Sequence, residues 1–324
     1  MNMDAHKLQP WMVRADWREP TQAWFWVEPG EWASDALPPV PVIAVGEDND
    51  PRAAAADLIV PDRRALDRVA KRIEAAPRTA AAIVHLLRAI DPARLAESLT
   101  TESLAFAALQ GGEEHRHWLA TRSPAVPRAE GNLLVEREGN RLTLVLDRVH
   151  ARNAIDRAMR DALFDAMALA ALDDAVEEIR LLANGRCFSV GAELAEFGTV
   201  ADQVEAHMIR MRTLPAWPLS RSGCRFTAHV QGACIGAGLE LAAFADRLTA
   251  TPDAWFQLPE LAMGLLPGFG GTVSLARRLG RRSACRLILA GNRIGAKEAL
   301  AIGLIDAIMD DGAADQGRAD EVRG

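Results

Sequence analysis

The sequence predicts an α/β protein with a largely parallel sheet. Two observations support this fold class. After residue 132, short runs of β-forming apolar residues alternate with stretches of helical periodicity, and two of the strand-to-helix turns are rich in glycine. The chain has 324 residues, of which 49% are apolar and 25% charged, so it can bury a sizeable core in one or two domains.

Composition argues against several other classes of protein. The formal net charge of −7 disfavours a general nucleic-acid-binding protein. No uninterrupted apolar stretch reaches about 18 residues, and the first residues lack the basic and apolar regions of a secretory signal. We therefore expect a cytoplasmic protein with no membrane span.

The cysteines and histidines do not have the spacing of a metal site, because no CxxC, HxxxH or HExxH pattern occurs. We expect His115 and His117, on either side of Arg116, to be solvated. The cysteines are expected to be buried, reduced thiols. They are Cys187, Cys224, Cys234 and Cys285.

The first 40 residues are rich in tryptophan, since five of the eight tryptophans in the chain precede residue 33. Exposed indole rings are costly, so this segment is expected to pack on the main body or on a neighbouring subunit. Short buried strands are predicted at 41–46 and 56–60.

Four helices are predicted next from apolar residues at helical spacing. Helix-breaking residues separate them at Pro77, at Asp91-Pro92 and at Gly111-Gly112. The predicted ranges are 63–76, 78–90, 95–110 and 113–122. A proline-rich, polar stretch at 123–132 is predicted to be a linker.

The rest of the chain follows the alternation of strand and helix. Two β-type runs within 132–148 flank Glu138-Gly139-Asn140, which is a hairpin signal. Further strands are predicted at 177–185, 224–232 and within 246–259. Helices are predicted at 154–174, 239–246, 272–280, 283–291 and 295–303.

Two glycine-containing turns, 187–198 and 229–246, each follow a strand. Small residues let the backbone approach a ligand closely, and free amides at a helix start can bind an anion or a developing oxyanion. Neither turn matches a phosphate loop or a dinucleotide fingerprint. Close packing alone explains such a turn about as well as a binding site does.

Two acids lie beside these turns. Glu240 is in the first turn of a predicted helix, where it could simply complement the helix dipole. Glu260 follows Pro259 in an apolar, glycine-rich run, where it could be a solvated residue near a helix start. Together, two carboxyl groups next to amide-rich turns favour acid–base chemistry beside an oxyanion hole.

Five ordered stretches of the chain resemble the crotonase superfamily, the enoyl-CoA hydratase and isomerase proteins. They are LDRVHARNAID (146–156), CFSVGAEL (187–194), HVQGACIGAGLELAAFAD (229–246), FQLPELAMGLLPGFGGT (256–272) and LAGNRIGAKEALAIGLID (289–306). The resemblance implies a crotonase-like spiral of ββα repeats, and a coenzyme A thioester as substrate without a prosthetic group. It also implies a homo-oligomer, a trimer or a hexamer.

The resemblance also assigns site residues. The thioester oxygen is expected between the amides of Ala192 and Ala237, with Glu240 and Glu260 as the catalytic acids. The positions expected to meet substrate or coenzyme A are Ala151, Arg152, Val190, Gly191, Glu193, Gly236, Gly238, Pro267 and Gly268.

Three of these positions depart from the family's usual residues. Ala237 stands where a glycine is common, and Glu193 replaces an aspartate. Any residue except proline still offers an amide at position 237. Arg152 replaces an apolar residue, and it is expected either to contact nucleotide phosphates or to be solvated.

The two ends of the chain suggest an altered order of parts. Few residues follow GLID, whereas the helical stretch 63–122 resembles the family's C-terminal portion. The predicted organisation is a Trp-rich and helical cap region (1–125), a crotonase-like core (126–310) and an acidic, disordered tail (311–324). The cap is expected to fold back on the core or on a neighbour, as in a circular permutation.

The leading functional hypothesis is hydration of a 2-enoyl-CoA, or its reversal. Double-bond isomerisation or hydrolysis of an acyl-CoA is the alternative within the family. A non-catalytic assembly protein, with its Trp-rich start as the contact surface, is the alternative outside catalysis. The acyl chain stays open, because residues 195–220 carry no specific motif.

Overall fold

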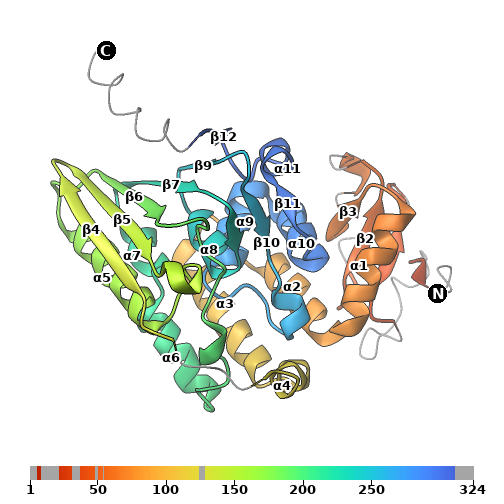
Figure 1. Ribbon diagram of the computed structural model, residues 1–324. Coiled ribbons are helices and arrows are strands. Elements are labelled where there is room, and N and C mark those ends of the chain that lie inside the picture. The colour runs from red at the N-terminus through yellow and green to blue at the C-terminus, as the bar shows by residue number, and fades with distance from the viewer. Residues whose placement is uncertain are drawn as a thin grey trace.

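The computed structural model describes residues 6–8, 22–30, 37–47, 50–53, 55–123 and 128–310. The strands of these residues form three sheets. The first is a parallel sheet near the N-terminus, with the order β1 (Phe25–Val27), β2 (Val42–Val45) and β3 (Leu58–Val60). Figure 1 shows it at the edge of the molecule, next to α1.

Helices α1 to α4 follow this sheet, and local residues explain where they begin. Asp62 caps the first helix by accepting a hydrogen bond from the Ala65 amide, and Pro77 is the first residue of the second. Each boundary lies within about two residues of its prediction. The bounds are α1 (Arg63–Ala75), α2 (Pro77–Ala89), α3 (Leu95–Gln110) and α4 (Glu113–Ala120).

The main sheet has six strands in the order β12-β9-β7-β6-β5-β4. The predicted hairpin is its antiparallel edge, β4 with β5, and every other neighbouring pair is parallel. The strands are β4 (Asn132–Glu138), β5 (Arg141–Asp147), β6 (Glu178–Ala183), β7 (Arg225–Val230), β9 (Arg247–Ala250) and β12 (Ala307–Ile308).

A third sheet is smaller and has the strand order β11-β10-β8. Its strands are β8 (Ala233–Ile235), β10 (Trp255–Gln257) and β11 (Ile294–Gly295). The helices of this half are α5 (Arg157–Leu172), α6 (Gln203–Thr213), α7 (Ala216–Arg221), α8 (Ala237–Ala242), α9 (Gly271–Leu279), α10 (Arg281–Ala290) and α11 (Ala296–Ala301). Short 3-10 turns, among them η6 (Glu260–Met263), connect these elements.

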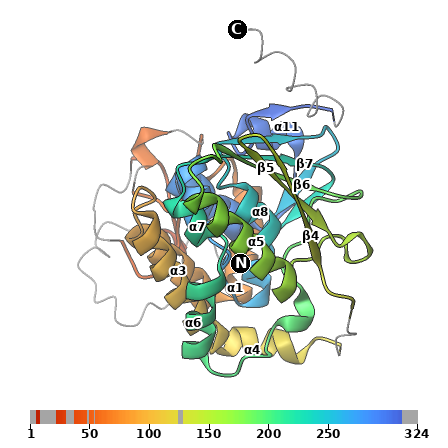
Figure 2. The same ribbon diagram turned by 90° about the vertical axis from the view of Figure 1, so that its left-hand side faces the viewer.

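The N-terminal helices pack directly on the core. Helix α3 contacts α6, α7 and α9, helices α1 and α2 contact α10, and both α1 and α4 contact η6. Figures 1 and 2 show α3 alongside the core helices from two directions. A helical region far from Glu240 and Glu260 would have contradicted the predicted altered order of parts. The observed contacts place this region against the core.

A buried ion cluster joins the N-terminal sheet to the core. The carboxylate of Asp57, which is 1% exposed, is paired with Arg88 of α2 and with Arg281 of α10, and it accepts the amide of Val42 in β2. Removing one partner of a buried ion pair leaves an uncompensated charge, which typically costs about 3–5 kcal/mol. The cluster therefore ties three elements together.

The expectation that His115 is solvated is wrong. His115 is buried, whereas His117 is exposed as predicted. The Nδ1–H of His115 donates to the carbonyl of Met263 at 2.8 Å, and its ring stacks on Trp118. Arg116 and His117, which follow it, are exposed, but helix α4 presents His115 itself to η6.

The tryptophans at 24 and 26 are fully buried, as expected for part of the Trp-rich segment. The tryptophans at 11, 17 and 32, and the predicted tail 311–324, lie outside the described residues. All four cysteines are free thiols; Cys234 and Cys285 are buried and the other two partly exposed. None of the helices described is both long and apolar enough to cross a membrane.

Candidate active site

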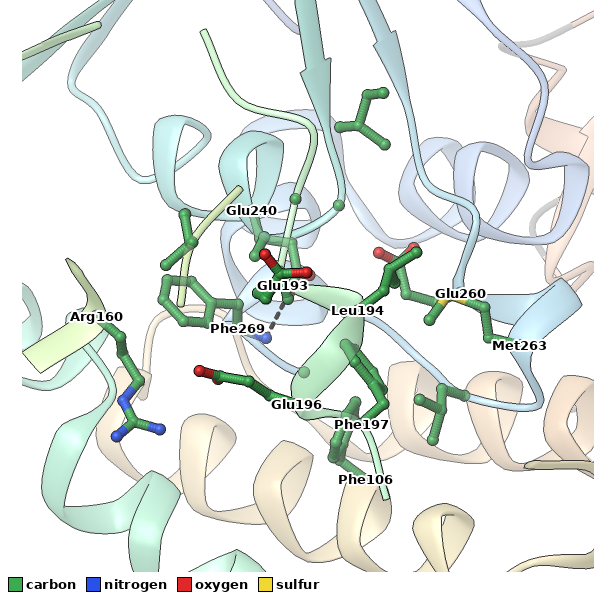
Figure 3. A pocket seen from close by; sticks show the side chains of 18 of the residues that line it. Phe106, Arg160, Glu193, Leu194, Glu196, Phe197, Glu240, Glu260, Met263 and Phe269 are labelled. Atoms are coloured by element: carbon green, nitrogen blue, oxygen red, sulfur yellow. Dashed lines mark hydrogen bonds between the residues drawn. The ribbon is translucent and has the colours of Figure 1, made fainter. Parts of the chain in front are cut away.

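A cavity of about 210 Å³ lies where the two predicted turns meet η6 and helix α3. Its walls are mainly apolar and include Phe106, Leu214, Met263 and Phe269. Figure 3 shows Glu240 and Glu260 among the side chains that line it. Both predicted catalytic acids therefore reach the same space from different elements.

Hydrogen bonds fix the backbone of the first turn. Gly191 has a φ of 95°, a conformation that favours glycine, and its amide donates to the Ser189 hydroxyl at 3.1 Å. The amides of Ile155 and Glu193 donate to the carbonyls of Gly191 and Ile155, respectively. This pairing leaves the Ala192 N–H without a hydrogen-bond acceptor among the described residues.

The second turn supplies a similar free amide. Gly236 has a φ of 48°, and its own N–H donates to the Gln257 carbonyl at 3.0 Å. The Ala237 N–H that follows has no acceptor in the described part of the chain. A Cβ atom built on Gly191 would lie 3.6 Å from the Ala237 nitrogen, so the two turns are in contact.

Glu240 is 2% exposed and accepts two backbone hydrogen bonds. The amides of Phe269 and Gly271 donate to its Oε2 at 2.6 and 2.9 Å, and the first of these is drawn in Figure 3. Burial raises the pKa of Glu240 well above its ordinary value, and the charges of Glu260 and Glu102 raise it further. The two amides act in the opposite direction by favouring the ionised form.

Glu260 is 8% exposed, and burial raises its pKa to about 8. Its Oε2 is buried without a hydrogen-bond partner among the described residues. Its Oε1 lies 2.7 Å from where a Cβ atom on Gly236 would be, so the carboxyl group is next to the second turn. Two such carboxyl groups do not ionise together readily, and they titrate as a pair.

A second cavity, of about 400 Å³, adjoins the first turn on its other side. Three arginines line it: Arg122 after helix α4, Arg128 before β4, and Arg152. It shares Val190, Ala192, Glu193 and Leu194 with the first cavity. The combination of an arginine-lined space beside an apolar one suits a ligand with phosphates at one end and an apolar acyl group at the other.

The structure brings most of the predicted site residues to the first cavity. Those that line it are Val190, Gly191, Ala192, Glu193, Gly236, Ala237, Glu240, Glu260 and Gly268. Arg152 lines only the second cavity. Three predicted positions are buried and line neither cavity: Ala151, Gly238 and Pro267.

Glu193 differs from Glu240 and Glu260 because an arginine pairs with its carboxylate. Its Oε2 accepts from Arg148 at 2.8 Å, and Arg148 itself is 3% exposed. The pairing neutralises Glu193 and anchors the turn that carries Ala192. No cluster of three or more His, Cys, Asp or Glu residues suited to a metal occurs among the residues described.

Helix α3 contributes residues that the motifs did not indicate. Phe106 and Gln110 line the cavity, and Glu102 lies behind it. A Cβ atom on Gly268 would lie 2.1 Å from the Phe106 ring, so helix and loop are in tight contact. The sequence held one signal for Glu102. It lies three residues after Leu99 and four before Phe106, so it shares a helix face with these apolar residues.

A model of the family "Enoyl-CoA hydratase/isomerase" matches residues 136–316. The chain is 34% identical over 178 residues to the 2,3-dehydroadipyl-CoA hydratase of Escherichia coli, covering 55% of this chain and 69% of that protein. The matched family region begins after helices α1 to α4.

Solved structures are similar over a slightly larger share of the chain. The enoyl-CoA hydratase of Thermoplasma volcanium is 33% identical, with a TM-score of 0.53, over 59% of this chain and 76% of that one. A Thermobifida fusca protein solved in complex with CoA is 26% identical, with the same TM-score and the same two shares.

Proposed function

Because the chain belongs to the enoyl-CoA hydratase/isomerase family, we propose that it adds water across the double bond of a 2-enoyl-CoA, or reverses that reaction. One observation carries this proposal. Two backbone amides that have no acceptor among the described residues, those of Ala192 and Ala237, line the same cavity as two buried carboxyl groups, Glu240 and Glu260. A thioester oxygen needs such donors, and hydration needs an acid and a base.

The two amides polarise the thioester carbonyl and stabilise the enolate that develops when water attacks the β-carbon. Donors of this kind are each worth about 3–4 kcal/mol of transition-state stabilisation. The apolar walls strengthen the effect, because a low local dielectric strengthens each electrostatic contact.

The hydrogen bonds divide the roles of the two acids. Glu240 receives two backbone N–H donors, so it is the better site for a negative charge and for holding and deprotonating water. Glu260 has no donor to its Oε2 in the described structure, so of the two carboxyl groups it is the better site for the proton. Glu260 therefore supplies the proton to the α-carbon.

The arginine-lined second cavity supports a coenzyme A ester as the substrate. The side chains of Arg122, Arg128 and Arg152 offer positive charge to phosphates, while the neighbouring Ala192 amide faces the thioester. We also propose that the chain forms a trimer or a hexamer, as the family resemblance implies. Sedimentation analysis measures this oligomeric state.

Substitution of the two acids tests the assignment. Glu240→Gln and Glu260→Gln are each expected to lower the hydration rate of a crotonyl-type CoA ester by a factor on the order of 100 to 10,000. Affinity for the ester, measured by titration calorimetry, should change only slightly because neither carboxyl group binds the CoA portion. Glu205→Gln is the control, since Glu205 pairs with Arg212 on the surface of α6.

Near-normal turnover in either variant would remove that residue from the mechanism. Mass analysis of the product separates the reactions: hydration adds one water to the ester, isomerisation leaves its mass unchanged, and hydrolysis releases free coenzyme A. A chain that binds no ester and turns none over would be a non-catalytic member.

A further inference from the structure

Glu102 is a buried carboxyl group that the proposed mechanism does not use. It comes from helix α3, is 1% exposed, and does not line the cavity. Its partners, Gly270 and Thr272, lie 168 and 170 positions further along the chain, at the start of helix α9. A buried carboxyl group is expensive unless its oxygens are satisfied, so these contacts have to be favourable.

The segment 269–272, which runs into the first turn of α9, divides its backbone donors between Glu102 and Glu240. The amides of Phe269 and Gly271 donate to Glu240. The amides of Gly270 and Thr272 donate to Glu102 at 2.7 and 2.9 Å, and the Thr272 hydroxyl donates to it as well. Alternate N–H groups thus point to opposite sides of one short segment, and a carboxyl group fixes each side.

Gly270 makes this alternation possible, because its φ of 95° turns the chain between the two sets of donors. A residue with a side chain is strained at this φ, and its Cβ would lie 2.6 Å from the Phe244 ring. The segment therefore depends on the two carboxyl groups and on tight packing for its shape.

The titratable groups around Glu102 come from two elements, α6 and α8. Arg210 of α6 favours its ionised form, and Glu240 of α8 faces it across the loop. His207 of α6 is linked through the neighbouring Ser103, whose hydroxyl contacts both His207 Nδ1 at 2.8 Å and Arg210 Nε at 3.1 Å. Burial raises the pKa of Glu102 to about 7. The hydrogen bonds from Gly270 and Thr272 and the charge of Arg210 act in the opposite direction.

We propose that Glu102 is a positioning residue, which holds residues 269–272 so that the Phe269 and Gly271 amides face Glu240 and fix it for reaction. The proposal rests on the role of Glu240 in the proposed function. It also gives the N-terminal helices a direct part in catalysis, because α3 supplies the group that shapes the loop.

A double-mutant cycle tests this proposal in the full-length protein. Glu102→Gln is expected to lower kcat for a crotonyl-type CoA ester by a factor on the order of 10 to 100, with KM changed less than threefold. In a Glu240→Gln background the same change should alter kcat less than threefold, because its effect passes through Glu240. Glu97→Gln, which removes an exposed carboxylate from the same helix, is the control for both backgrounds.

Amide hydrogen exchange gives a readout that needs no turnover. Exchange in the peptide containing residues 268–273 should be faster in Glu102→Gln than in the unsubstituted protein, and unchanged in Glu97→Gln. If Glu102→Gln does not fold, Thr272→Val removes only the hydroxyl donor, and it should show the same changes to a smaller extent.

Unchanged loop exchange would overturn the proposal. Equal losses of kcat in both backgrounds would also overturn it, since Glu102 would then support the fold and not Glu240. The proposed function fails separately, when the unsubstituted protein does not hydrate the ester or when Glu240→Gln is fully active.

Discussion

At the scale of single residues, the surroundings of Glu260 disfavour its ionised form and favour its protonated form. Its Oε2 is buried without a partner in the described structure, and its pKa is raised from 4.5 to about 8. Between these two pH values the native protein holds a proton that the unfolded chain releases. The free energy of unfolding contributed by Glu260 therefore falls as the pH rises from 4.5 to 8.

Glu260→Gln should consequently stabilise the protein at alkaline pH. Glutamine has no proton to lose, so the gain should be small below pH 4.5 and reach about 1–4 kcal/mol above pH 8, since each tenfold change in acidity corresponds to about 1.4 kcal/mol. Denaturant titrations of both proteins at the two pH limits measure this difference. A gain that is the same at both limits would show that Glu260 is not raised in pKa.

Residue types near the two turns singled out the acids, and resemblance to the crotonase superfamily assigned the amides, because the relevant neighbours are close in sequence. Glu240 follows its turn directly, and Ala192 lies within its own. Glu102 and His115 were not found in the same way, since their partners, Thr272 and Met263, are more than a hundred positions away. Local polarity suggested a solvated His115, and only the packing of α4 on η6 buries it.

At the scale of elements, contact between two turns brings the two free amides together. Gly238 of α8 is central to this contact, because an added Cβ would lie 2.6 Å from the Ser189 Cβ and 2.9 Å from its Oγ. The same hydroxyl accepts the Gly191 amide and donates to the Asn153 carbonyl. Displacing Ser189 would therefore move the turn that carries Ala192.

Gly238→Ala is expected to reduce stability by about 1–3 kcal/mol, the usual cost of overpacking, and to lower kcat more than it changes ester affinity. Gly223→Ala is the matched control, because nothing lies within 4 Å of its added Cβ. Thermal unfolding and steady-state kinetics of both variants provide the comparison. Equal behaviour of the two variants would mean that the turns do not need this close contact.

Element boundaries followed the sequence well where capping residues mark them. The helix expected at 154–174 spans Arg157–Leu172, and its cap is Asp156, which accepts the Met159 amide. The order of strands in the main sheet did not follow from the sequence alone, because short parallel strands carry no signal for their neighbours. Resemblance to a known family implied a spiral of ββα repeats, and the strand order itself was not predicted.

At the scale of the whole molecule, the predicted crotonase-type α/β fold is confirmed by its similarity to solved enoyl-CoA hydratases. The additional N-terminal helices contribute Phe106 and Gln110 to the cavity and Arg122 to its neighbour. We propose on these contacts that residues 63–122 act as the cap of the core, with an altered order of parts.

A cut between the two parts tests this organisation. A protease site inserted between residues 123 and 128 should allow cleavage without separation, because α1, α2, α3 and α4 all contact core elements. The cleaved protein should elute as one species in size-exclusion chromatography and keep most of its activity. Two separate species, or immediate loss of activity without unfolding, would contradict a cap that is held by packing.

The distance along the chain between Glu102 and Gly270 also affects how the protein is made. At about 5–20 residues per second, a ribosome needs roughly 10–30 s to add the 168 residues that separate them. Throughout that interval the nascent α3 has neither the loop that satisfies Glu102 nor the glycine that packs on Phe106. Chaperones that shield apolar surface during translation thus have a defined period in which to act on this protein.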